Sequence, residues 1–300
     1  MIELRNVVKS FDGFRALDQL SMHVPKGAIY GLVGPNGAGK STVLRHITGV
    51  YRQDAGEVLM EGTPIYENPS VKVRMADIPD ELYYFVSATT RDMMKFYREF
   101  YPRFDAKRYE ALKDIFSTVD EKRPIRRLSK GMQKQSAFWL ALCCRPDILV
   151  LDEPVDGLDP VMRRQVWSLL MADVAEFETT VLVSSHNLRE LEDVCDHVGI
   201  LSKGRVLLER TLSELQETVT KFQLAFLQGE ENILPKELDI LHQSQLGRVQ
   251  TLIVRGSAEK AKEQLSALNP ILLDALPLSL EEIFIYELGG EDYAVRELVL

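Results

Sequence analysis

The chain has 300 residues, with 36 Lys and Arg against 45 Asp and Glu, a formal net charge of −9. Its length allows one large domain, or a domain of about 200 residues with a smaller one attached. The acidic total argues against nucleic acid as the main partner. The three cysteines, none in a C-x-x-C spacing, argue against a disulfide framework or a zinc site and fit a reducing compartment.

Neither a leader sequence nor a membrane span is expected. Residues 1–6 show no basic segment followed by an apolar core, so they do not resemble a signal peptide. The longest apolar run, residues 137–144, is less than half of the roughly 20 residues that cross a bilayer. We therefore expect a soluble protein, or one that reaches a membrane through another protein.

The first part of the chain is predicted to be rich in strands. Residues 2–11, 16–24, 28–33 and 55–62 have strand-like patterns, and a short helix over 43–49 interrupts them. Turns are expected at 9–13 and 25–27, each of which ends in glycine. Four such segments around one helix predict a mixed, partly antiparallel sheet.

A glycine-rich segment joins the strand at 28–33 to the helix that follows. It matches the pattern G-x-x-x-x-G-K-[ST] and comprises Gly34, Pro35, Asn36, Gly37, Ala38, Gly39, Lys40, Ser41 and Thr42. Glycines let a backbone wrap an anion, and a helix N-terminus adds free N–H donors and partial positive charge. Lys40 is expected to reach the β- and γ-phosphates and the Ser41 hydroxyl to bind Mg²⁺. The segment therefore predicts a phosphate-binding loop.

A phosphate loop does not hold the base of a nucleotide, so an aromatic platform is needed elsewhere. Phe11 lies in an early turn and could stack on the base. Its position alone fits a core residue equally well.

Residues 72–127 have a different character. Segments 93–101 and 109–116 carry apolar residues at helical spacing, and the region holds much of the aromatic content of the chain. We expect a helical subdomain over about 72–145. Its aromatic residues either pack its interior or form a docking surface for a helix of a partner.

A second small-residue helix start follows at residues 127–135. Ser129 is a suitable N-cap, and with Gly131 it forms the kind of helix N-terminus that binds anions. This signal is weak on its own. An apolar helix then extends to residue 144.

Two carboxylates follow the apolar strand 148–151. Asp152 can bind Mg²⁺ beside a phosphate loop, and Glu153 can orient or deprotonate an attacking water. A turn at 155–160 and a helix over 161–177 come next. Strand 180–185 then ends at His186, which is either a hydrogen-bonded structural residue or part of the same catalytic edge. A helix over 188–195 and a hairpin of 198–201 with 205–209 complete the region.

A domain boundary is predicted near 215–220. Beyond it, strands are expected at 222–227, 249–254 and 271–273, and helices at 258–268 and 280–288. The predicted domains are residues 1–215 and a small α+β domain over 220–300.

Taken together, these motifs resemble those of the nucleotide-binding subunit of an ABC transporter over residues 1–215. Residues 34–42 resemble the Walker A loop, 128–132 the ABC signature and 148–153 Walker B. Residues 157–159, ending in Asp159, resemble the D-loop, His186 the switch histidine, and Phe11 the aromatic A-loop. The resemblance implies an α/β P-loop NTPase fold with a mixed core sheet, an antiparallel β subdomain and a helical subdomain.

The family mechanism implies that two subunits enclose two ATP molecules. Ser129 and Gly131 of one chain would contact the γ-phosphate held by the other, and the D-loop residue Asp159 would belong to the same site. Glu153 would be the catalytic base and His186 would sense the γ-phosphate. Ser41 would ligate Mg²⁺ with Asp152 close by.

The sequence departs from the family pattern at two positions. Lys130 replaces the first glycine of the signature, while Ser129 and Gly131 remain. Asp80 stands where the family usually has the Q-loop glutamine. A carboxylate can also bind Mg²⁺, so the expected metal ligands are Ser41, Asp80 and Asp152.

Residues 278–284 resemble the S-L-E-[DE]-[IV]-F ending of ABC-2 type exporters. This favours a bacterial exporter of peptide, drug or lipid, with a transmembrane permease subunit and a second, identical or different, ATPase subunit. Such a protein would sit at the cytoplasmic face of the cell membrane. The alternatives are a soluble ABC ATPase of translation or DNA maintenance and a regulatory module without turnover. The first usually has two cassettes or a coiled-coil insertion, and intact Glu153 and His186 argue against the second.

Overall fold

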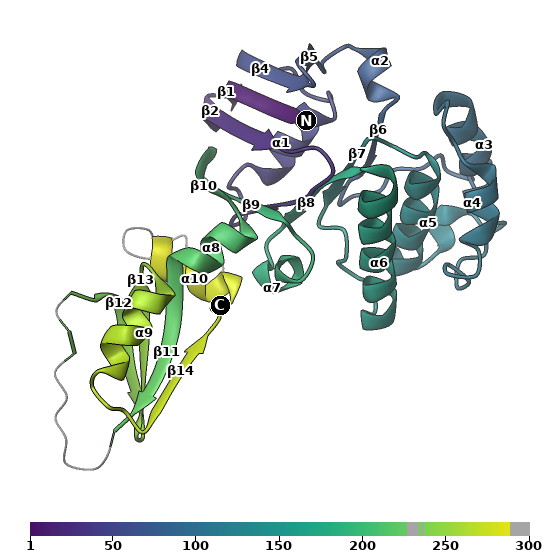
Figure 1. The fold of residues 1–300 in the computed structure, drawn as a ribbon. Coiled ribbons are helices and arrows are strands. Elements are labelled where there is room, and N and C mark those ends of the chain that lie inside the picture. Colours follow the sequence, from purple (N-terminus) through teal and green to yellow (C-terminus); the bar gives the residue numbers. More distant parts are fainter. Residues whose placement is uncertain (227–233, 236, 289–300) are drawn as a thin grey trace. The chain divides into compact units, whose positions relative to one another are not determined.

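The computed structural model describes residues 1–226, 234–235 and 237–288. The chain divides into two compact units (Figure 1). The first contains Met1–His186 and Val194–Glu209, and the second contains Asn187–Asp193 with the described residues from Arg210 onward. Residues 187–193 thus join the second unit, although they precede the boundary predicted near 215–220.

An antiparallel sheet forms one part of the first unit. Its strands lie in the order β2 (Phe14–Val24), β1 (Ile2–Phe11), β4 (Ala55–Met60) and β5 (Thr63–Pro64). Ile2 pairs with Val24 on one side and with Met60 on the other. The apolar residues of the sheet belong to a cluster that also includes side chains of the second sheet.

The second sheet carries the central strands of the unit. Its order is β10 (Arg205–Thr211), β9 (His197–Ser202), β3 (Ile29–Val33), β8 (Thr180–Ser185), β7 (Ile148–Asp152) and β6 (Met75–Ile78). Strands β9, β3, β8, β7 and β6 are parallel. The two-residue turn between β9 and β10 can only join antiparallel strands, so the sheet is mixed.

The expectation that the strands of residues 2–62 share one sheet is wrong. Every residue of β3 is buried, whereas β1 and β4 each contain both buried and exposed residues. A strand buried on both faces belongs in the middle of a parallel sheet, and β3 lies between β8 and β9. Strand β6 was not predicted, because its four residues include the polar Asp77 and give too short a pattern.

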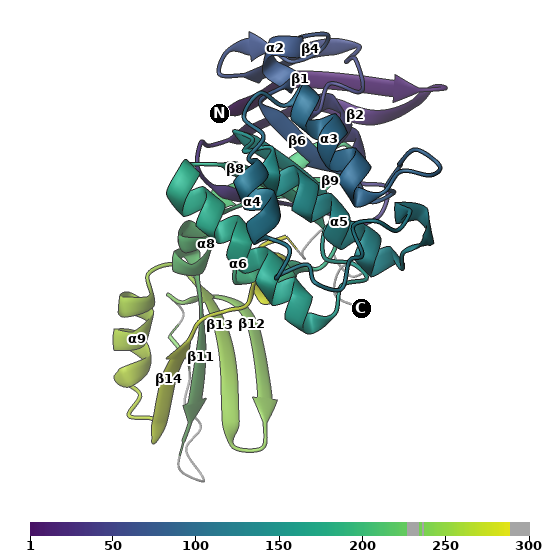
Figure 2. The ribbon, with the colours of Figure 1, turned by 90° about the vertical axis from the view of Figure 1, so that its right-hand side faces the viewer.

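The helices of the first unit are α1 (Lys40–Ile47), α2 (Pro69–Lys72), α3 (Thr90–Phe100), α4 (Ala106–Ala111), α5 (Lys130–Cys143), α6 (Pro160–Phe177) and the 3₁₀ turn η1 (Ile125–Arg127). Helix α5 packs against α3 and α4 (Figure 2). The Trp139 ring on α5 stacks on Tyr109 with centroids 4.6 Å apart. These contacts build the helical subdomain.

The helix predicted over 109–116 begins and ends earlier. Asp105 caps α4 by accepting a hydrogen bond of 2.9 Å from the backbone N–H of Arg108, and the helix ends at Ala111. Helix α3 likewise begins at a capping box formed by Thr89 and Asp92. Side-chain caps, rather than the apolar spacing alone, therefore set these boundaries.

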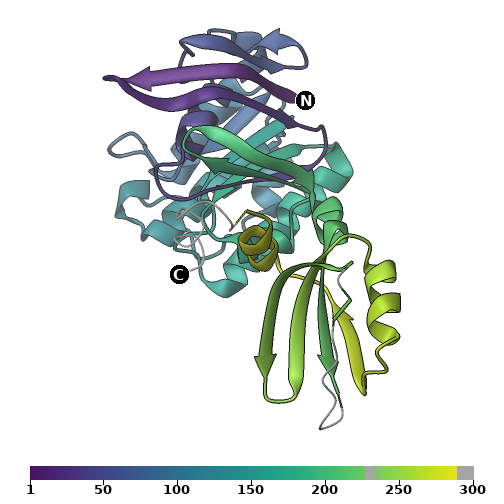
Figure 3. The same ribbon diagram turned by 90° about the vertical axis from the view of Figure 1, so that its left-hand side faces the viewer.

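The second unit is α+β (Figure 3). It contains α7 (Leu188–Glu192), α8 (Leu212–Thr218), β11 (Val219–Ala225), β12 (Asp239–Leu246), β13 (Val249–Arg255), α9 (Ala258–Ser266), β14 (Leu272–Leu276) and α10 (Leu280–Leu288). The antiparallel sheet order is β12-β13-β11-β14. Phe222 and Leu252 of this sheet form a core with Leu265 of α9.

Strand β12 was not predicted from the sequence. Its side chains are mostly exposed and polar, so it lacks the apolar alternation that marks a half-buried strand. The strand predicted at 222–227 begins earlier, at Val219, and residue 227 lies outside the described part. Within the described residues, no helix combines the length and apolar character needed to cross a membrane.

Candidate nucleotide-binding and catalytic site

The predicted phosphate loop lies where parallel strands end. Strands β3, β7 and β8 are adjacent and run in the same direction, so their carboxyl ends share one edge of the sheet. Residues 34–42 follow β3, Glu153 follows β7, and His186 follows β8. The fold thus brings together three motifs that are far apart in the sequence.

Two glycines are required by the geometry of the loop. A Cβ at Gly34 would lie 2.3 Å from the backbone oxygen of Leu201, so the position has no room for a side chain. Gly39 has φ of 110°, in the left-handed region that favours glycine, and directly precedes α1. The loop therefore approaches the neighbouring backbone closely and turns sharply into the helix N-terminus.

Lys40 is buried at the start of α1. Its Nζ donates a hydrogen bond of 2.7 Å to the carbonyl of Gly34. The same Nζ lies 3.9 Å from Oε1 of Glu153. Burial lowers the pKa of Lys40, and the nearby carboxylates of Glu153 and Asp152 oppose this shift. The ammonium group is thus held inside the loop, beside the residue that follows β7.

The carboxylates at the end of β7 are fixed by β8. The Ser184 hydroxyl donates a short hydrogen bond to Asp152, and the Glu153 N–H donates to the Ser184 carbonyl at 3.1 Å. Glu153 has φ of 45°, which is uncommon for a residue other than glycine. Burial raises the pKa of Glu153, against the opposing effect of His186. Desolvation of this kind is typical of a catalytic base.

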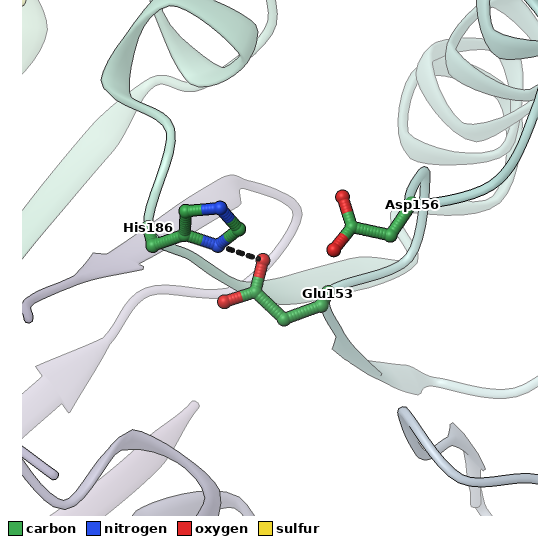
Figure 4. A group of neighbouring side chains, drawn as sticks. All are labelled: Glu153, Asp156 and His186. Carbon is green, nitrogen blue, oxygen red and sulfur yellow. Dashed lines mark hydrogen bonds and ion pairs between the residues drawn. The ribbon is translucent and has the colours of Figure 1, made fainter. Parts of the chain in front are cut away.

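His186 contacts Glu153 directly (Figure 4). Its Nδ1 lies 3.0 Å from Oε2 of Glu153, and this hydrogen bond raises the pKa of His186. An ionised carboxylate only accepts, so Nδ1 carries the proton in this pair. Within the described residues, donor atoms of Glu153, Asp156 and His186 lie within 4.8 Å of one another. The residue types suit a divalent ion as well as a proton relay.

Asp156 is a residue that the sequence analysis missed. It was treated only as part of the turn at 155–160, yet its carboxylate faces the Glu153–His186 pair (Figure 4). The sequence does offer a signal for it, because Asp156 lies three residues after the predicted base Glu153 and directly before Gly157 of the turn.

The three expected Mg²⁺ ligands line one pocket of about 490 Å³. Ser41, Asp80 and Asp152 all contribute to its wall, and so does Asp77, which the sequence analysis did not select. Hydroxyl and carboxylate oxygens are the protein ligands that Mg²⁺ prefers. The donor set therefore fits the ion, although Asp80 also lies 3.9 Å from the Nζ of Lys134.

The predicted signature residues have structural roles within their own chain. The Ser129 hydroxyl caps α5 by accepting from the N–H of Met132 at 3.3 Å. A Cβ at Gly131 would lie 2.7 Å from the backbone oxygen of Gly157. Asp159 caps α6 by accepting from the N–H groups of Val161 and Met162, each at 3.0 Å. Neither Ser129 nor Gly131 hydrogen-bonds to residues 34–42, all of which are described.

Phe11 is partly packed. Its ring meets Tyr51 edge to face, with centroids 5.3 Å apart, and Lys9 Nζ lies 5.4 Å from its centroid. The residue is 36% exposed. The structure thus leaves part of the ring accessible, and stacking on a base stays a prediction.

A separate apolar groove of about 850 Å³ lies in the helical subdomain. Residues 83–86, α3 and the end of α2 form its walls. Phe85 and Phe96 meet edge to face at 5.7 Å, and both are exposed, at 63% and 42%. Tyr109 and Phe116 are buried, so they pack the interior as one of the two interpretations predicts. A docking role for the exposed aromatic residues stays a prediction.

Known proteins are similar to this chain in both sequence and fold. Residues 17–156 match the family model described as ABC transporter. The ABC transporter ATP-binding protein YtrB of Bacillus subtilis is 35% identical over 97% of this chain and 99% of its own length. That degree of similarity over two whole chains establishes the relationship.

The chain belongs to the ABC transporter family of ATP-binding proteins. A second relative, the daunorubicin/doxorubicin resistance ATP-binding protein DrrA of Streptomyces peucetius, is 34% identical over 73% of this chain and 67% of its own. A solved ATP-binding subunit of an ABC transporter superposes with a TM-score of 0.67, at 25% identity, over 72% of this chain and 92% of that one.

Membership in this family confirms the predicted fold class and ATPase activity. The chain is an ATP-binding subunit of an ABC transporter and hydrolyses ATP. The prediction of a transport ATPase, rather than a soluble ABC ATPase of translation or DNA maintenance, is also confirmed.

Proposed function

We propose that this chain binds MgATP at residues 34–42, hydrolyses it with Glu153 as the base, and thereby drives export through a membrane permease. The observation that carries the proposal is the convergence of Lys40, Glu153 and His186 at one sheet edge. A buried cation, a desolvated carboxylate and a hydrogen-bonded histidine form a site for phosphate binding and water activation.

The residues divide the chemistry between them. The N–H groups of residues 34–42 and the N-terminus of α1 bind the phosphates, and Lys40 neutralises their charge. Glu153 accepts a proton from the attacking water, and its hydrogen bond to His186 at 3.0 Å fixes the carboxylate in position. Ser41 and Asp152, with Asp80, would hold Mg²⁺, which neutralises charge on the β- and γ-phosphates when bound.

A second subunit would complete the site. Ser129 and Gly131 lie at the N-terminus of α5, a helix of fourteen residues with no acidic residue in its first turn. Such a terminus binds an anion, and the γ-phosphate of a facing subunit supplies one. Gly157, in the turn that precedes Asp159, lies against Gly131, so Asp159 would lie at this interface too. Phe11 would stack on the base. The two subunits would be either two copies of this chain or this chain and a related one.

The permease would dock on the apolar groove that residues 83–86, α3 and the end of α2 form, which we call the aromatic groove. Among soluble proteins, large contiguous apolar patches mark interaction sites, and this one carries exposed Phe85, Phe96 and Phe100. An apolar helix at the cytoplasmic end of a membrane subunit fits it. This contact would hold the protein at the cytoplasmic face of the membrane.

The proposed cargo class is a peptide, drug or lipid. The support is the ending at residues 278–284 together with the relative named for resistance to daunorubicin and doxorubicin. We further propose that residues 220–300 act as an accessory domain distinct from the ATP-binding domain of residues 1–215.

The decisive experiment measures ATP binding, turnover and oligomeric state of Glu153→Gln against the parent chain. The variant should bind MgATP, form a dimer by size-exclusion chromatography in its presence, and lose turnover by about 100-fold or more. Parent-level turnover would exclude Glu153 as the base. Recovery of the full chain from detergent extracts with ribosomes or DNA, and without a multi-span membrane protein, would contradict the transport assignment.

A further inference from the structure

Lys134 is a buried lysine on α5 that no motif accounts for. Its side chain is only 6% exposed, although lysine is almost never buried without a partner. Its Nζ donates a short hydrogen bond to the backbone carbonyl of Glu153. The cation is thus directed at the main chain of the residue that carries the proposed base.

The contacted carbonyl belongs to an unusual stretch of backbone. Glu153 has φ of 45°, a conformation that costs energy for a residue with a side chain and persists only where its surroundings hold it. On one side, the Glu153 N–H donates to Ser184. On the other side, Lys134 binds the carbonyl. The direction of the Glu153 side chain depends on both contacts, because the backbone sets it.

Asp80 supplies the second contact of Lys134. Its Oδ1 lies 3.9 Å from Nζ, and its carboxylate is 59% exposed. Asp80 begins the segment 80–86, and residues 83–86 of that segment line the aromatic groove. One ammonium group therefore contacts the backbone of the catalytic residue and Asp80, which precedes the groove-lining residues 83–86 by three positions.

We propose that Lys134 is a positioning residue for ATP hydrolysis, which fixes the Glu153 backbone and ties it to segment 80–86 through Asp80. The inference rests on the proposed function, since it assigns the base to Glu153. Lys134 acts through Glu153 and does not contact the nucleotide. Its removal should therefore lower kcat and leave KM for ATP close to the parent value.

The first test is Lys134→Met in the full chain, a variant that keeps the length of the side chain and removes its donors. We expect a fall in kcat of about tenfold or more, the effect of losing one charged hydrogen bond. KM for ATP should stay within about twofold, because Lys40 and residues 34–42 bind the phosphates. Lys134→Gln, which keeps an N–H donor, should recover part of the lost kcat.

The second test is a double-mutant cycle with Asp80→Asn. If Asp80 acts through Lys134 as well as through the metal, Asp80→Asn lowers kcat in the parent chain by a larger factor than it does in Lys134→Met. If Asp80 instead acts only as a metal ligand, the two losses add. Additive losses would overturn the tie between Lys134 and segment 80–86.

Controls separate positioning from folding and from the assignment of the base. Lys107→Met, at an exposed position on α4, should keep the parent kcat. Thermal unfolding and binding of a fluorescent ATP analogue check that each variant is folded. Parent-level kcat in Lys134→Met would overturn the proposal, and if that variant does not fold, Lys134→Leu, which also lacks donors, decides in its place. Glu153→Gln, measured in parallel, reports separately on the base.

Discussion

The catalytic edge and the aromatic groove belong to the same compact unit and follow opposite physical rules. At the edge, Lys40 is buried and Glu153 is mostly buried, and both are paired, Lys40 with the Gly34 carbonyl and Glu153 with His186. In the groove, large apolar side chains are exposed and contact mainly one another. A desolvated polar network suits chemistry within the chain, whereas exposed apolar surface favours burial against another molecule.

The largest expected effect tests the edge. Lys40→Ala should weaken ATP binding by about 10- to 100-fold, because the variant loses a buried, charged donor to the phosphates. Equilibrium titration with a fluorescent ATP analogue measures this affinity. A change of less than about twofold would show that residues 34–42 do not hold the phosphates through Lys40.

The next prediction tests whether the aromatic groove binds the permease independently of the catalytic edge. Phe85→Ser with Phe96→Ser should weaken binding to the permease by about tenfold, because aromatic anchors dominate such interfaces. ATPase activity of the isolated chain should stay within about twofold. Phe177→Ser, at a residue that is 43% exposed at the end of α6, is the matched control. Loss of activity in the isolated groove variant would mean that the groove is not a separate surface.

A smaller effect, on folding stability, is expected where the N-terminus of α5 meets the turn after Pro154. Gly131→Ala places a Cβ 2.7 Å from the Gly157 carbonyl. Overpacking of this kind costs about 1–3 kcal/mol, whereas helix propensity alone would favour alanine by up to about 1 kcal/mol. Denaturant unfolding gives the sign of the change in stability. Lys107→Gly compared with Lys107→Ala, on exposed α4, measures the glycine-to-alanine propensity effect without the contact. If Gly131→Ala stabilises the chain, the Gly157 carbonyl can move away from the added methyl group at little energetic cost.

The smallest expected effect concerns pH and stability. Burial raises the pKa of Glu153 from its ordinary 4.5 in the folded chain, so this group stabilises the fold only at low pH and that contribution is lost as pH rises. Glu153→Gln should therefore raise Tm above the parent value at neutral pH, with a gap that narrows toward pH 4.5. A gap that widens on acidification would contradict a raised pKa.

The sequence predicts the edge well and the groove only in part. The loop at 34–42, the strand before Asp152 and the strand before His186 are local patterns with a known mechanism, so their positions follow from the order of the strands. The groove depends on which faces of α3 and of residues 83–86 remain uncovered, and apolar spacing cannot show this. Lys134 was missed because a lysine on a helix normally indicates a solvated face, and its burial results from tertiary packing.

The second unit shows the same limit. Strands β11 and β13 and helix α9 were predicted because they bury a shared apolar core. Strand β12 has no such signal, since its residues pair by backbone hydrogen bonds and leave their side chains exposed.

The contact between Gly131 and Gly157 also explains which substitutions the signature tolerates. Lys130 is exposed, so a long charged side chain fits where the family usually has glycine. One residue later, the Gly157 carbonyl occupies the space that a methyl group would need. In variant libraries of this chain, position 130 should therefore accept many residue types, whereas position 131 should return almost only glycine.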